Sequence, residues 1–141
     1  KYSVALNADL AFVHKRRVKG AKNQVEAKGV IGDVEGRVCV IIDDMIDTAG
    51  TIVAAAEVLK ANGAESVMAA ATHGVLSGPA VDRLKYSMIE KVVVTDTLPL
   101  PSEKRFDKLE VLSVAPIIAD AIESVFEDTS VSDIFGGHNQ S

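Results

Sequence analysis

Residues 38–52 read VCVIIDDMIDTAGTI, and this stretch decides the fold. Its first five residues are apolar without alternation, which predicts a strand over residues 38–43 that is buried on both faces in a parallel sheet. Residues 51–61 follow with apolar side chains at helical spacing, and Asn62 and Gly63 are suited to end that helix. A buried strand that runs directly into a helix is typical of α/β domains.

The same alternation continues along the rest of the chain. The pattern predicts further strands over residues 10–14, 66–72, 91–96 and 109–114, a short one at 30–31, and helices over 79–87 and 116–128. Residues 15–29 are polar and basic without helical periodicity, so we expect a flexible loop there, and we expect the tail 136–141 to be disordered. Residues 1–141 are therefore predicted to form one domain of the α/β class, with a doubly wound, mostly parallel sheet flanked by helices.

Composition narrows the functional classes. The chain has 141 residues, 48% of them hydrophobic, and a formal net charge of -5, which argues against nucleic acid as the main partner. No apolar run reaches the length of a membrane span, so we expect no membrane partner. The single cysteine, Cys39, lies inside an apolar strand, so an intrachain disulfide is impossible; we expect a structural thiol and a cytoplasmic location.

The turn after the predicted strand is suited to binding an anion. Thr48, Ala49, Gly50 and Thr51 stand at the amino end of a helix, where unpaired N–H groups and the helix dipole favour negative charge. Gly50 allows close approach of the ligand to the backbone, and the two threonines add hydroxyl donors. A phosphate group would fit this turn, although no other phosphate-loop motif occurs in the sequence.

The preceding aspartates need a different partner. Ionised Asp43, Asp44 and Asp47 accept hydrogen bonds and would repel a phosphate, unless they bind another part of the same ligand. A sugar diol and a hydrated Mg²⁺ are both suitable partners, so a phosphorylated sugar that also meets Mg²⁺ explains the whole stretch. The alternative is an acidic helix cap with solvated aspartates, which would suit one aspartate better than three.

The stretch VCVIIDDMIDTAGT resembles the phosphoribosyl-pyrophosphate loop of type I phosphoribosyltransferases and of the ribose-phosphate pyrophosphokinase family. The segments HKRR, ATHGVLSGPA, VTDTLPLPSEKRF and SVSDIF point to the second of these. The resemblance covers nearly the whole chain but only the carboxyl-terminal half of those enzymes. The chain also opens with KYSVALNADL, which has the pattern of a helix already under way, so we expect a piece of a longer polypeptide.

The resemblance implies a reaction and a set of roles. In that family ATP gives its β,γ-diphosphoryl group to the 1-hydroxyl of ribose 5-phosphate in the presence of Mg²⁺, and AMP is released. The turn 48–51 would hold the 5-phosphate, and Asp47 would orient it. Asp43 and Asp44 would meet the ribose hydroxyls and magnesium-bound water. A homo-oligomer, a hexamer in the family, is also implied.

The basic segment can be interpreted in two ways. Lys15, Arg16 and Arg17 could belong to a solvated loop, but they follow a strand end near the expected anion site. Diphosphoryl transfer develops charge that cations stabilise. The resemblance matches Lys15 to a catalytic lysine and Arg17 to its partner on a mobile loop. Val18 stands where many family members have proline, which leaves the closed geometry of that loop open.

Other candidate residues carry weaker signals. His73 could face the site, but a capped or core-packed histidine is the more common case, and no metal-ligand spacing joins the three histidines. By resemblance, Ser130, Val131 and Ser132 contribute to an allosteric phosphate or ADP site between subunits. Two alternatives stay open: a phosphoribosyltransferase that uses the same sugar diphosphate, and a non-catalytic regulatory homologue.

Overall fold

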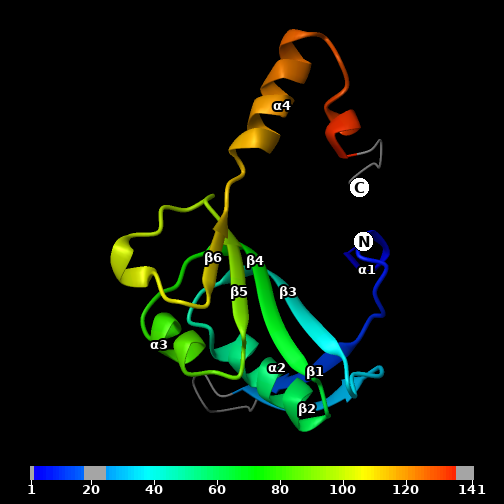
Figure 1. Cartoon of the computed structure of the whole chain (residues 1–141), viewed down its shortest axis with the longest axis vertical. Coiled ribbons are helices and arrows are strands. Elements are labelled where there is room, and N and C mark those ends of the chain that lie inside the picture. Colours follow the sequence, from blue (N-terminus) through cyan, green and yellow to red (C-terminus); the bar gives the residue numbers. More distant parts are fainter. Residues whose placement is uncertain (1, 18–24, 136–141) are drawn as a thin grey trace.

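The structure, a computed structural model, describes residues 2–17 and 25–135. Figure 1 shows the arrangement of its helices and strands. In chain order the elements are α1 Tyr2–Ala5, β1 Phe12–Arg17, β2 Val25–Ile31, β3 Val38–Ile46, α2 Gly50–Ala61, β4 Ser66–Gly74, α3 Ala80–Lys85, β5 Lys91–Thr95, η1 Ser102–Lys104, β6 Leu109–Leu112, α4 Ala115–Phe126 and η2 Val131–Phe135.

A four-stranded parallel sheet in the order β3-β4-β5-β6 forms the centre of the domain. Val38 pairs with Ser66 and Val92 with Leu109, so all four strands run in one direction. Their carboxyl ends therefore lie along the same edge of the sheet. The predicted α/β class, with a mostly parallel sheet and flanking helices, is confirmed. In folds of this class, that edge is where ligands bind.

Strands β1 and β2, residues 12–17 and 25–31, form an antiparallel pair beside this sheet, called the hairpin below. The prediction that a loop begins at Lys15 is wrong, because β1 continues through Arg17 and β2 begins at Val25. The reason is that two antiparallel strands satisfy each other's backbone N–H and C=O groups, which overrides the polar composition of the segment. The register shifts between His14 and Lys15. Residues 18–24 of the expected loop lie outside the described residues.

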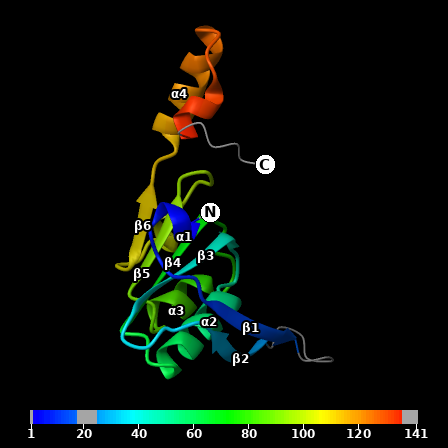
Figure 2. The ribbon, with the colours of Figure 1, turned by 90° about the vertical axis from the view of Figure 1, so that its right-hand side faces the viewer.

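Helix α2 connects the two β structures and supplies much of the core. It contacts β3 and β4 of the sheet as well as β1 and β2 of the hairpin (Figures 1 and 2). The buried residues of α2 form one stripe of apolar side chains at helical spacing, as predicted from the sequence. The stripe packs with apolar side chains from the sheet and from the α3 region. The largest fully buried members of the core are Leu76, Leu84, Ile89, Val67, Val92 and Val94.

Strand β3 departs from its prediction in two ways. It extends to Ile46, so Asp44 lies within the strand together with Asp43, instead of after it. It is also not buried on both faces, because Val38 is 61% exposed and Val40 46% exposed. Among the described strands β3 has a partner on one side only, and its residues 38–44 line an open cavity of about 1340 Å³. Helix α1 and residues 6–13 form the opposite wall of that cavity.

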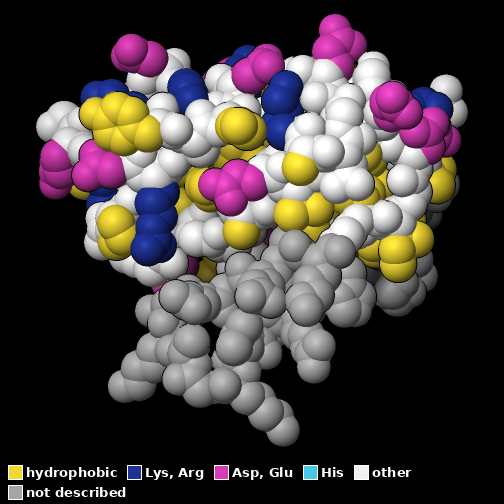
Figure 3. Space-filling view, turned by 90° about the horizontal axis from the view of Figure 1, so that it is seen from below, with side chains coloured by type: hydrophobic (Ala, Val, Ile, Leu, Met, Phe, Trp, Pro, Cys, Tyr) yellow, Lys and Arg dark blue, Asp and Glu magenta, His cyan; other side chains and the backbone are white. Residues whose placement is uncertain are grey.

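Helix α4 stands away from the sheet, beyond the carboxyl end of β6, in both Figure 1 and Figure 2. Its described contacts are with η2, and its apolar residues Ile117, Ile118 and Phe126 are exposed. In the part of the chain that the structure describes, no helix is long and apolar enough to cross a membrane. On the face shown in Figure 3, acidic and basic side chains are interspersed with apolar ones.

Candidate functional site

The turn from β3 into α2 is built around Ala49. This residue has φ 60° and ψ 0°, which is the left-handed conformation, and only 5% of it is exposed. Val53 N–H donates to the Ala49 carbonyl at 3.0 Å, so the N–H groups of residues 50–52 precede that bond at the start of α2. No side chain caps this end, and the first turn holds no acidic residue. The turn therefore presents donors and the positive end of the helix dipole.

Asp47 is held by the segment that follows β4. Its carboxylate accepts a hydrogen bond from the Ser77 hydroxyl, and its backbone carbonyl accepts one from Ser77 N–H at 3.0 Å. The neighbouring Leu76 N–H donates to the Ile46 carbonyl at 3.0 Å. Residues 76–77 thus bind the end of β3 and the start of the turn, and Ser77 was not predicted as a site residue.

Asp43 and Asp44 are both exposed, and one oxygen of each is used locally. Asp43 Oδ1 accepts from Asp44 N–H at 3.0 Å, and Asp44 Oδ1 accepts from Met45 N–H at 2.8 Å. Both aspartates line the cavity beside β3, together with Thr72. Among the described residues, the second oxygen of each carboxylate makes no hydrogen bond and can accept from a ligand.

His73 belongs to a small polar network at the carboxyl edge of the sheet. Its Nδ1 lies 2.9 Å from the Thr97 hydroxyl oxygen. The hydroxyls of Thr95 and Thr97 both donate to the Thr72 carbonyl, at 2.6 Å and 3.1 Å. This arrangement agrees with the interpretation of His73 as a capped side chain.

Arg83 reaches the turn from α3. Its Nη1 donates to the Thr48 carbonyl at 2.9 Å. A Cβ added at Gly50 would lie 3.2 Å from the same nitrogen, so the absence of a side chain at Gly50 makes room for the guanidinium. Arg83 was not predicted as a site residue, since nothing in the local sequence pattern indicates a contact 35 residues away.

The remaining predicted residues lie elsewhere or are only partly described. Lys15 and Arg17 have strand backbone in β1, and their side chains lie outside the described residues. Ser130 precedes η2, and its hydroxyl oxygen accepts from Ser132 N–H at 3.3 Å. Because η2 packs against α4, the segment 130–132 is not part of the group formed by residues 43–51 (Figure 1).

The carboxylate oxygens of the site suit a hard cation that also takes ligands from outside the protein. No cluster of three or more His, Cys, Asp or Glu side chains arranged to hold a metal ion occurs within residues 2–17 and 25–135. Asp43 and Asp44 offer carboxylate oxygens, which Mg²⁺ prefers, and Mg²⁺ usually keeps several water molecules. The two carboxylates therefore fit a magnesium ion that water and phosphate oxygens also coordinate.

The fold and the carboxyl edge of the sheet define an α/β domain in which an acidic strand end leads through a tight turn into the uncapped start of a helix. The chain matches the phosphoribosyl synthetase-associated domain over residues 8–136, and it belongs to this family. The family predicted from the motif is thereby confirmed.

Individual relatives agree with this assignment. The chain is 62% identical over 130 residues to a ribose-phosphate pyrophosphokinase of Streptomyces avermitilis, covering 92% of this chain and 40% of the relative. It is 54% identical to one of Caldanaerobacter subterraneus, covering 95% and 42%. A crystal structure of phosphoribosylpyrophosphate synthetase from Mycobacterium smegmatis superposes with a TM-score of 0.77 at 44% identity, covering 90% of this chain and 40% of that one. The chain thus spans about two fifths of the length of these relatives.

Proposed function

We propose that this chain is the carboxyl-terminal part of a ribose-phosphate diphosphokinase and supplies its ribose 5-phosphate site and catalytic loop. The observation that carries the proposal is the turn 47–51, which joins the carboxyl end of β3 to the uncapped amino end of α2. The relatives that share up to 62% of its residues over this region bear the name ribose-phosphate pyrophosphokinase. ATP and ribose 5-phosphate are the proposed substrates.

The proposed turn binds the 5-phosphate through its backbone and hydroxyls. Residues 48–51 present N–H groups at the start of α2, and the helix dipole favours the charge of the phosphate. Asp47 keeps its carboxylate on Ser77 and orients the turn, so that its negative charge is already hydrogen-bonded. This arrangement reduces the repulsion that an unpaired aspartate would exert on a phosphate.

The exposed aspartates receive the sugar. Asp43 and Asp44 each have one carboxylate oxygen engaged by a backbone N–H, which fixes the side chain, and a second oxygen that can accept from a ribose hydroxyl. They would also hold magnesium-bound water. Mg²⁺, when bound, would neutralise negative charge on the phosphate oxygens.

The transfer itself is a displacement at the β-phosphorus of ATP. The 1-hydroxyl oxygen of ribose 5-phosphate forms a bond to that phosphorus, and the hydroxyl proton is lost. The bond from the β-phosphorus to the α,β-bridging oxygen breaks, and its electron pair leaves with AMP. Lys15 and Arg17 stabilise the charge that develops on the transferred group, as positioned cations do in other phosphoryl transfers.

Further parts of the proposal concern the assembled enzyme. Residues Ser130, Val131 and Ser132 contribute to a regulatory phosphate or ADP site, and the enzyme is a cytoplasmic homo-oligomer, a hexamer as in the family it belongs to. The Ser130 hydroxyl already accepts a backbone N–H in η2, which supports a preformed turn there.

Calorimetric titration with ribose 5-phosphate tests the site directly. The wild-type chain is compared with Thr51→Ala and Asp47→Ala. We expect both variants to bind more weakly, Thr51→Ala by about tenfold because one hydrogen bond to a charged group is lost. Ribose without the phosphate serves as the control ligand and should not distinguish Thr51→Ala from wild type. Equal affinity of all three proteins for ribose 5-phosphate would remove the site from this turn.

A further inference from the structure

Residues in the segment 76–83 form hydrogen bonds to the turn 47–51 and to the end of β3 before it. At its start, Ile46 and Asp47 accept backbone hydrogen bonds from Leu76 and Ser77, both at 3.0 Å. The Ser77 hydroxyl adds a bond to the Asp47 carboxylate. Strand β3 and the loop after β4 are thus joined by three hydrogen bonds at the point where the turn begins.

The second contact, from Arg83, acts one peptide further along. Arg83 Nη1 donates to the Thr48 carbonyl at 2.9 Å and lies where a side chain on Gly50 would stand. Helix α3, which carries Arg83, is anchored through Ala80 and Leu84, both fully buried. The guanidinium of Arg83 therefore extends from a helix whose position is fixed by the core.

The orientation of one peptide plane follows from this contact. In a trans peptide the C=O and the N–H point in opposite directions. No cis peptide bond occurs among the described residues. Because Arg83 holds the Thr48 carbonyl, the N–H of Ala49 points away from Arg83. The left-handed conformation of Ala49 then turns the chain into α2. Arg83 thus acts on the backbone of the turn.

We propose that Arg83 is a positioning residue that fixes the Thr48–Ala49 peptide, so that its N–H faces the 5-phosphate. This inference rests on the proposed function of the turn as the ribose 5-phosphate site. Arg83 acts through the Thr48 carbonyl, with Ser77 as the second anchor of the same turn. A Cβ at position 50 would lie 3.2 Å from Arg83 Nη1, so a side chain there would crowd the guanidinium.

The test compares three variants of the chain. Arg83→Met removes the donor and keeps a side chain of similar reach, whereas Arg83→Lys keeps a donor and the charge. Lys85→Met is the matched control, since it removes a cation from the same helix whose described contact is with the Tyr86 ring. Affinity for ribose 5-phosphate is measured by calorimetry, and amide hydrogen exchange is measured at Val53, whose N–H donates to the Ala49 carbonyl at 3.0 Å.

We expect Arg83→Met to weaken binding about tenfold, the scale of one hydrogen bond at a charged ligand, and to speed exchange of the Val53 amide, whose acceptor Ala49 lies on the loosened peptide. Arg83→Lys should recover most of the affinity, and Lys85→Met should match wild type in both measurements. Unchanged exchange in Arg83→Met would overturn the positioning role whether or not ligand binds. Normal affinity in Arg83→Met, alongside weak binding by Thr51→Ala, would overturn its link to the phosphate.

The two proposals can fail separately. If Thr51→Ala and Asp47→Ala bind ribose 5-phosphate as wild type does, the proposed site is wrong, and the link of Arg83 to the phosphate falls with it. Faster exchange in Arg83→Met would still establish its hold on the Thr48–Ala49 peptide.

Discussion

At the scale of single residues, Ala49 carries the most unusual backbone of the candidate site. A left-handed conformation costs a residue with a Cβ about 1–2 kcal/mol relative to the right-handed one, and the methyl group of Ala49 is buried. Ala is the smallest residue that has this cost, so the position balances backbone strain against burial. Larger and β-branched side chains should shift that balance strongly.

Substitutions at Ala49 test this balance. Ala49→Gly relieves the strain but loses about 0.8 kcal/mol of methyl burial and adds freedom to the unfolded chain, so we expect stability within about 1 kcal/mol of wild type. Ala49→Val should destabilise by about 2 kcal/mol or more, because a β-branched residue rarely adopts this conformation. Urea unfolding monitored by circular dichroism gives both values. A Val variant as stable as wild type would contradict the observed turn.

Lys15 is the residue whose predicted role depends most on the reaction itself. In the full-length enzyme, Lys15→Ala should lower kcat by roughly a hundredfold or more, the scale seen when one positioned electrostatic group is lost. The KM for ribose 5-phosphate should change far less, because the proposed sugar site lies on residues 43–51. Steady-state kinetics at fixed magnesium measures both, with Lys28→Ala as a control cation from the same hairpin. A near-normal kcat in Lys15→Ala would contradict the catalytic role and indicate that the basic segment is only a solvated connection.

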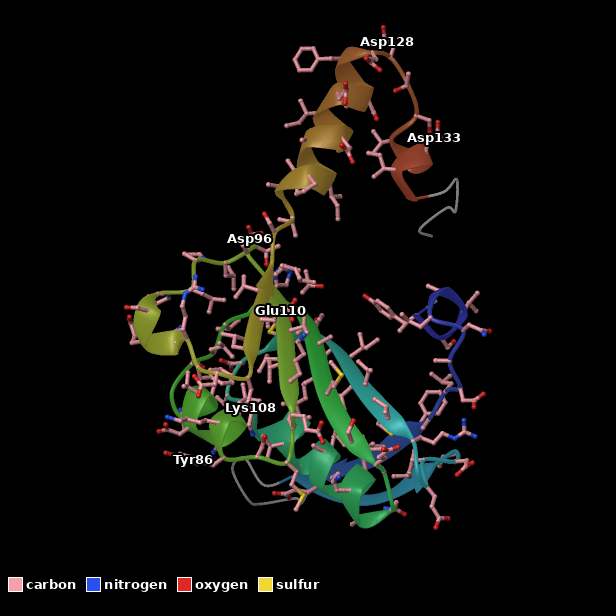
Figure 4. The ribbon with its side chains drawn as sticks, viewed as in Figure 1. Tyr86, Asp96, Lys108, Glu110, Asp128 and Asp133 are labelled. Carbon is pink, nitrogen blue, oxygen red and sulfur yellow. The ribbon has the colours of Figure 1, made fainter. Side chains whose placement is uncertain are left out.

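At the scale of elements, Asp96 connects the sheet to α4. Figure 4 shows it where β5 and β6 end and the chain leads to that helix. Its carboxylate accepts bonds from the Ser113 hydroxyl at 2.7 Å and from Val114 N–H at 2.8 Å. The hydrogen bond from Ser113, then that from Val114, lower the pKa of Asp96 below its ordinary value. The ionised carboxylate is therefore the form that anchors α4.

The sign of the pH dependence follows from that lowered pKa. The anchor is complete above the ordinary pKa of an aspartate, about 3.9, and is lost as the pH falls through the lower pKa of the folded state. We expect the Val114 amide to exchange faster below that range, measured by hydrogen exchange between pH 5 and pH 2. Asp96→Asn should remove this step. A step of equal size in the variant would assign it to another carboxylate.

At the scale of the whole molecule, two apolar surfaces lie open within the part of the chain that the structure describes. One is the cavity beside β3, lined by Val38 and Val40, and the other is the exposed apolar side of α4 with Ile118 and Phe126. The relatives extend well beyond the matched region, since the chain covers 40% of their length. The chain therefore carries only part of the surface that such relatives bring to their reaction.

The corresponding prediction concerns activity of the chain alone. We expect it to bind ribose 5-phosphate without making phosphoribosyl pyrophosphate, because nothing in its sequence resembles an adenine pocket. An AMP-release assay with ATP, ribose 5-phosphate and magnesium measures this, and a full-length ribose-phosphate pyrophosphokinase provides the positive control. Robust turnover by the chain would place the complete catalytic machinery within these 141 residues.

The sequence alone determined the elements whose signals are local. The apolar run 38–42, the helical stripe of α2 and the strands β4 to β6 were predicted because spacing and side-chain type act within a few residues. The class of the fold follows from their order. The start of α2 at the turn 48–51 was also predicted, because its signals lie in consecutive residues, whereas the role of the turn as an anion site stays a prediction.

The tertiary structure decided what depends on contacts distant in sequence. The hairpin of β1 and β2 forms because its strands pair with each other, which overrides a polar composition that locally favours a loop. The face of β3 is exposed because burial is set by neighbours and not by the strand itself. Arg83 and Ser77 reach the turn from 35 and 30 residues away. The pairing of β3 with β4 brings Ser77 there and the packing of α3 beside α2 brings Arg83, because hydrogen bonds depend on distance in space.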